Sequence, residues 1–134
     1  MEAIVGTTII SNGIRDMYNT MKQSFSHNNT SLNQALKQTD VTAKLRIAEV
    51  FIYEHEYDTS PTLQECIKLV HEQIIIVKSC LEEIDNIIQI FNKSYLRFGR
   101  KPNIEINLND LNNESNILNS RIYLMLNVQH NYKP

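Results

Sequence analysis

The chain has 134 residues, of which 42% are hydrophobic and 21% charged, with 13 Lys and Arg against 15 Asp and Glu. This length favours a single domain, and the hydrophobic content suffices for a core, which excludes a disordered chain. The formal net charge of -2 excludes a generally basic nucleic-acid-binding protein. Three Gly and three Pro are few for a fold with many tight turns, so the composition favours an all-α protein.

The N-terminus lacks the features of a targeting signal. Glu2 is acidic and Thr7 and Thr8 interrupt the apolar run, whereas a signal peptide has basic residues followed by about 7–15 apolar ones. No stretch reaches the roughly 18 apolar residues of a membrane-spanning helix. Cys66 and Cys80 would stand about 21 Å apart on one helix, too far for a disulfide. The sequence therefore predicts a cytoplasmic protein with reduced thiols.

Two helical segments are expected in the first half of the chain. In residues 2–25, apolar side chains recur with the period of an amphipathic helix, with Thr7 in one place: Ala3, Ile10, Ile14, Met17 and Met21. A second apolar face runs through residues 31–57, with Ile47 and Phe51 beside it: Leu32, Ala35, Leu36, Val41, Leu45, Ala48 and Ile52. Thr39 and Asp40 can interrupt or re-cap this second segment.

The third helix, residues 61–98, has the strongest pattern. Ser60 is a favourable N-cap, and Pro61 suits the first turn, where its missing N–H has no partner. One stripe alternates spacings of four and three: Leu63, Ile67, Val70, Ile74, Val77, Leu81, Ile84, Ile88, Phe91, Tyr95 and Phe98. This helix would be about 57 Å long, against a diameter of roughly 36 Å for a compact globule of this size. The molecule is therefore elongated, or the helix ends before Gly99.

A fourth helix is expected at residues 105–129, after a connector that contains Pro102. Its apolar residues share one face, on which Ser115 fills one position: Leu108, Leu111, Leu118, Ile122 and Met125. Four amphipathic segments joined by short polar loops predict an all-α, up-down-up-down four-helix bundle. The whole chain, 1–134, then forms one domain around one long central helix.

The sequence contains no recognisable catalytic or metal site. Bundles that hold two iron ions use Glu-x-x-His pairs, but none of the four histidines has an acid three positions earlier. There is no Gly-rich phosphate loop and no nucleophile elbow. We therefore expect neither enzymatic activity nor a cofactor or bound metal.

Basic residues gather at the exit of the third helix. Four cations occur there without an acid among them, beside Tyr95, Leu96 and Phe98: Lys93, Arg97, Arg100 and Lys101. Cations next to large apolar side chains suit contact with anionic lipid headgroups. The alternative is that they complement the negative end of the helix. Apolar residues near the N-terminus are candidates for membrane insertion or, alternatively, core residues: Ile4, Val5, Ile9 and Ile10.

Four short segments carry a family resemblance. They are Phe91-Asn92-Lys93-Ser94-Tyr95-Leu96-Arg97-Phe98, Asp110-Leu111-Asn112-Asn113, Leu124-Met125-Leu126-Asn127-Val128-Gln129 and the apolar start Met1-Glu2-Ala3-Ile4-Val5-Gly6. With the helix order, the first three resemble the N-terminal four-helix bundle of the mixed lineage kinase domain-like proteins, one of the HeLo-type cell-death domains of animals, fungi and plants. The apolar start resembles fungal members of that group. The specific part of the likeness is limited to the third-helix exit and the fourth helix.

The resemblance implies a bundle that binds anionic phospholipids and permeabilises membranes after release by an attached regulatory module. By the resemblance, the four cations would face lipid, and the four residues near the N-terminus would insert. The slightly negative net charge departs from this pattern, and the chain contains no regulatory module.

The alternative function is a structural or protein-interaction bundle, such as a viral or parasite accessory protein. Such a bundle self-associates or binds a partner helix, and it needs apolar surface left over after the bundle closes. The third helix has a surplus of apolar residues that could supply it: Ile75, Ile76, Ile87 and Ile90.

Overall fold

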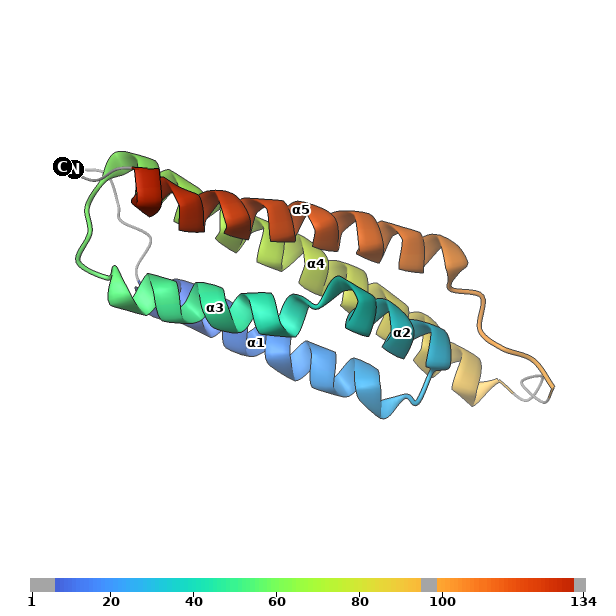
Figure 1. The fold of residues 1–134 in the computed structure, drawn as a ribbon. Helices are drawn as coiled ribbons and strands as arrows, with labels where there is room; N and C mark the ends of the chain where they lie inside the picture. Colours follow the sequence, from blue (N-terminus) through green and yellow to red (C-terminus); the bar gives the residue numbers. More distant parts are fainter. Residues whose placement is uncertain (1–6, 95–98, 132–134) are drawn as a thin grey trace.

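The computed structural model describes residues 7–94 and 99–131, with the side chains of residues 8–94 and 99–128. It contains the helices α1 (Thr7–Ser26), α2 (Thr30–Thr39), α3 (Val41–Glu54), α4 (Pro61–Lys93) and α5 (Glu105–Asn131). Helices α2 and α3 follow one another along one line, so the chain runs up, down, up and down an elongated bundle (Figure 1). The predicted all-α, up-down-up-down bundle with one long central helix is confirmed.

Helix α4 is the longest element, with 33 residues and a length of about 50 Å. Ser60 caps its start, because the Ser60 Oγ accepts a hydrogen bond of 3.4 Å from the Leu63 N–H. The predicted stripe is buried from Leu63 to Ile88. Helices α5 and α1 both pack against α4, and the contact between α4 and α5 is the most extensive in the bundle.

The end of α4 differs from the sequence prediction. The helix ends at Lys93 instead of residue 98, and Ser94 has extended backbone angles, φ -77° and ψ 134°. Phe91 is only half-buried and Ile88 is the last fully buried member of the stripe. Beyond Ile88 the core therefore gives the helix little support, and the Ser94 N–H closes the last turn on the Phe91 carbonyl at 3.0 Å.

The second predicted helix is divided at Asp40. This residue has φ +52°, in the left-handed region, so α2 ends before it and α3 begins after it. The break frees the carbonyl of Thr39, which accepts a hydrogen bond of 3.1 Å from the Asn119 Nδ2 of α5. The interruption that the sequence allowed at Thr39 and Asp40 is thus present, and α3 ends at Glu54 rather than at residue 57.

Each helix contributes its predicted stripe to one core. The buried residues outside α4 include Ile10, Ile14, Met17, Met21, Leu32, Leu36, Val41, Leu45, Ala48, Ile52, Leu111, Leu118, Ile122 and Met125. Gly13 lets α1 approach α4 closely, since a Cβ at this position would lie 3.2 Å from the ring of His71. The contact aligns residue 13 of α1 with residue 71 of α4.

We predict that Asn119→Ala lowers the free energy of unfolding by about 1 kcal/mol relative to Asn116→Ala. Both changes gain the same helix propensity in α5, but only Asn119→Ala removes the hydrogen bond to the buried Thr39. Urea unfolding followed by circular dichroism measures the difference. Equal stabilities of the two variants would mean that this bond does not support the break at Asp40.

Candidate functional site

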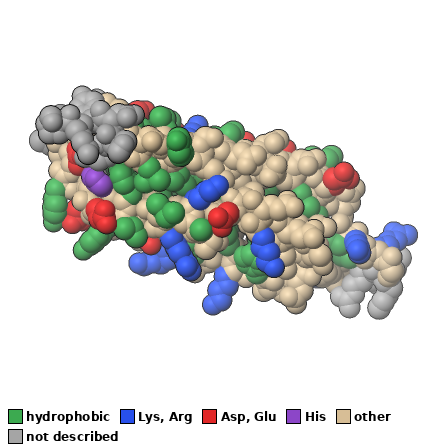
Figure 2. All heavy atoms as spheres, in the orientation of Figure 1, with side chains coloured by type: hydrophobic (Ala, Val, Ile, Leu, Met, Phe, Trp, Pro, Cys, Tyr) green, Lys and Arg blue, Asp and Glu red, His purple; other side chains and the backbone are tan. Residues whose placement is uncertain are grey.

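Three of the four predicted lipid-binding cations lie together at one end of the bundle. Lys93 is the last residue of α4, and Arg100 and Lys101 belong to the connector to α5; all three are exposed. Lys and Arg side chains are visible at this end of the molecule in Figure 2. Arg97 lies outside the described residues, as do the apolar neighbours at positions 95, 96 and 98.

The predicted inserting residues do not form one surface. Ile4 and Val5 lie outside the described residues. Ile9 is 55% exposed, whereas Ile10 is completely buried in the core. Ile10 is thus a core residue, which was the alternative to membrane insertion. Its insertion into a membrane would require α1 to leave the bundle.

The cations and Ile9 stand at opposite ends of the molecule. Gly13 packs against His71, and the distance along α4 from His71 to Lys93 is about 33 Å. Ile9 precedes Gly13 and lies farther still from Lys93. One flat membrane therefore cannot meet both groups while the bundle is closed.

Charge is distributed unequally along the bundle. Acidic residues lie in and beside the connection between α3 and α4, at the end opposite the cations (Figure 1). They are Glu54 at the end of α3, Glu56 and Asp58 in the connection, and Glu65 near the start of α4. Asp58 is partly used in structure, because its Oδ1 accepts a hydrogen bond of 2.8 Å from the Ser60 N–H. The rod thus has one basic and one acidic end.

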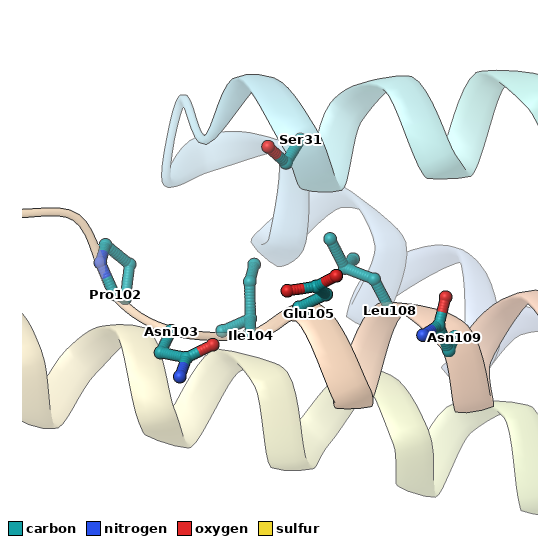
Figure 3. Close-up of a pocket in the computed structure, with 7 residues that line it drawn as sticks. All are labelled: Ser31, Pro102, Asn103, Ile104, Glu105, Leu108 and Asn109. Carbon is teal, nitrogen blue, oxygen red and sulfur yellow. The ribbon is translucent and has the colours of Figure 1, made fainter.

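A pocket of about 370 Å³ adjoins the basic connector (Figure 3). Its lining consists of Ser31, Pro102, Asn103, Ile104, Glu105, Leu108 and Asn109. In Figure 3, Ser31 of α2 faces the start of α5 across this space. Glu105 places a carboxylate in the lining at the first turn of α5, where it complements the helix dipole. This lining does not suit the phosphate of a lipid headgroup.

A buried polar cluster joins α1 to α4. The Asp85 carboxylate accepts a hydrogen bond of 3.0 Å from the Ser24 Oγ and lies 3.2 Å from the His27 Nε2. Burial raises the pKa of Asp85, while Ser24 and His27 act in the opposite direction. Asp85 and Ser24 are almost inaccessible to solvent, so the cluster connects two helices and offers little to a ligand.

The remaining reactive groups are ordinary in their surroundings. Cys66 is buried, Cys80 is half-buried, and both are free. Burial is the main cause that raises the pKa of each thiol, which disfavours the nucleophilic thiolate. Within residues 7–94 and 99–131, no group of three or more His, Cys, Asp or Glu is arranged to hold a metal ion.

An apolar groove lies between α3 and α5. It has a volume of about 390 Å³ and is lined by Arg46, Ile47, Val50, Phe51, Glu54 and Leu126. Ile47 and Val50 are each 56% exposed, and Phe51 is half-buried with its ring stacked on His55 at 4.2 Å. Figure 2 shows hydrophobic side chains gathered over this part of the molecule. We call these residues the α3 groove.

The sequence placed Ile47 and Phe51 beside the apolar face of this segment, but it did not predict that they line an exposed groove. Nine of the 14 residues of α3 are apolar, and they occupy both faces of the helix. Val50 and Tyr53, which lie outside the buried stripe, were the available signal. The expected surplus on α4 is also present: Ile75, Ile76 and Ile90 are exposed, and Ile87 is half-buried against the core.

Comparisons with family models, curated proteins and solved structures find no match to this chain. The resemblance to HeLo-type bundles therefore stays a prediction. Among the helices of the described residues, none combines the length and the apolar character needed to span a bilayer.

We predict that Asp85→Asn gains stability relative to the wild type as pH rises from about 3 to about 7. The raised pKa of Asp85 means that its contribution to stability, present below the unfolded-state pKa, is lost as pH rises through the folded-state pKa. The amide keeps an oxygen for Ser24 and avoids this loss. Urea unfolding at several pH values measures the gain.

The matched control is Glu83→Gln, an exposed change on the same helix. Its stability relative to the wild type should stay within about 0.5 kcal/mol at every pH. The prediction would be contradicted if the free energy of unfolding of Asp85→Asn, relative to that of the wild type, fell as pH rises.

Proposed function

We propose that this protein is a non-enzymatic interaction bundle that binds an amphipathic helix of a protein in the α3 groove. The observation that carries the proposal is the exposure of Ile47 and Val50 above Phe51 and Leu126. When a partner covers apolar side chains that are exposed to water, the complex is stabilised by about 25 cal/mol per Å² of apolar surface buried. Contiguous surface of this kind marks an interaction site.

The composition of the groove favours a protein helix over a lipid. One basic residue, Arg46, and one acidic residue, Glu54, flank its apolar centre. An apolar centre with a charged rim is the usual arrangement at protein interfaces. Helix-in-groove binding uses apolar anchors separated by three, four and seven positions, and Ile47, Val50 and Phe51 place apolar side chains three and four positions apart on α3.

A photo-reactive residue at position 50 tests this proposal in cells that express the protein. We expect Val50→benzoylphenylalanine to form a specific covalent adduct, and mass spectrometry should place the link on an amphipathic helix. The added change Ile47→Glu should abolish the adduct, because it puts a charge at the edge of the contact.

Glu83→benzoylphenylalanine is the matched control, since residue 83 is exposed on α4, away from the groove. We expect no adduct there. Failure to form an Ile47-dependent adduct at position 50, in a variant that unfolds like the wild type, would overturn the proposal.

A second candidate function, binding of anionic phospholipid, is supported by the basic end. Lys93, Arg100 and Lys101 are exposed together, and the acidic residues of the α3–α4 connection lie at the other end. A rod with this polarity would approach a negatively charged membrane with its basic end first. Both candidate functions assume the cytoplasmic location expected from the sequence. Permeabilisation, as in HeLo-type proteins, would need α1 to leave the bundle.

Sedimentation with phospholipid vesicles tests the second candidate. We expect binding to vesicles that contain about 30% phosphatidylserine, and weaker binding at high salt. The double change Arg100→Glu and Lys101→Glu should weaken it at least about tenfold, since each cation near the surface contributes about 1 kcal/mol. Lys68→Glu, an exposed change on the first half of α4, should have little effect. Equal binding of the wild type and the double variant would contradict this function.

A further inference from the structure

We propose that the helix bound in the α3 groove is α3 of a second copy of this chain, packed antiparallel about a two-fold axis at Val50. This inference rests on the proposed function and names its partner. It follows from the symmetry of the exposed face of α3 and the placement of its charges.

The outer face of α3 is self-complementary about Val50. Arg46 lies one turn before Val50 and Glu54 one turn after it, and all three are exposed. A two-fold contact uses the same surface on both copies, so each residue before the axis meets the residue equally far beyond it. Arg46 of each copy would therefore lie beside Glu54 of the other, with the two Val50 side chains at the centre.

The side chains on the outer face of α3 form two neighbouring rows. Residues 46, 50 and 54 form a row with a spacing of four, and Ile47 and Phe51 belong to the neighbouring row. The α3 groove is the space beside and between these rows. A two-fold axis at Val50 places the first row of one copy over the same row of the other, so that Arg46 and Glu54 of different copies meet.

Arg46 and Glu54 form no ion pair within the described chain. Residues 46 and 54 are about 12 Å apart on one helix, beyond the reach of a direct ion pair. Within the described residues, 7–94 and 99–131, the structure forms one ion pair, between His27 and Asp85. Burial raises the pKa of the Tyr18 phenol of α1, Glu49 raises it further, and Arg46 lowers it. Arg46 therefore lies near Tyr18, but neither Arg46 nor Glu54 forms an ion pair within the described residues, and both can pair with a second copy.

The contact area predicts a weak dimer. One pair of 14-residue helices, even with the contribution of Leu126, buries less than the roughly 1,600 Å² of a standard stable interface. We therefore expect association in the micromolar to millimolar range, with the oligomeric state dependent on concentration.

Charge reversal tests the arrangement, with sedimentation equilibrium of the full chain between about 5 µM and about 500 µM. The wild type should dimerise. Arg46→Glu alone places two acidic residues in contact, and Glu54→Arg alone two basic ones, so each should weaken the dimer at least about tenfold. The double variant should dimerise like the wild type. A mixture of the two single variants should form a heterodimer, because both of its charge contacts become attractive.

Each other result has a defined meaning, provided that the variants unfold like the wild type. A monomer at all concentrations would overturn the dimer, as would a dimer that neither single reversal weakens or a mixture that stays monomeric. The adduct at position 50 separates this failure from failure of the proposed function. Its mass should be about twice 15.6 kDa for a second copy. A different mass would retain the interaction function with another partner.

Discussion

The unbroken apolar stripe on α4 is the constraint on which the rest of the structure depends. This stripe is buried from Leu63 to Ile88, and α5, with 27 residues, is long enough to cover it alone. Helices α5 and α1 pack against α4, and two shorter helices, α2 and α3, pack against α5 and α1 and close the bundle. Their junction at Asp40 is tolerated because Asn119 of α5 satisfies the carbonyl that the break leaves free. The stripe therefore determines the length of the bundle, and α5 and α1 bury it directly.

Apolar contacts alone would allow the helices to slide, and buried polar residues fix their positions. Gln73 of α4 donates hydrogen bonds to the backbone oxygen and the carboxylate of Glu114 at 2.9 and 2.5 Å. Asp85 fixes α1 in the same manner through Ser24. Displacement of either helix by one turn would leave a buried polar group without its partner, at a cost of about 1–3 kcal/mol. Register thus depends on a few polar residues within the apolar stripe.

The sequence predicted what is local and missed what depends on distant contacts. Helical periodicity placed α1, α4 and α5 well, since their apolar faces are continuous. The break at Asp40 was an open alternative, because its support comes from Asn119, far along the chain. The exit of α4 was placed too late, because the stripe continues in sequence beyond the part that the core buries. The cations of the basic end lie together because they are close in sequence. Ile9 lies far from them because α1 runs in the same direction as α4, so the start of α1 and the end of α4 are at opposite ends of the bundle (Figure 1).

The proposed dimer constrains the lipid-binding alternative. The axis of α3 follows that of the bundle (Figure 1), so two copies that pair antiparallel direct their basic ends away from each other. Lys93, Arg100 and Lys101 of both copies could not rest on one flat membrane. A dimer would therefore either bridge two anionic surfaces or bind one of them through a single copy. Binding of both copies to the same membrane would require the α3 contact to separate, which makes dimerisation and flat membrane binding competing states of the same molecule.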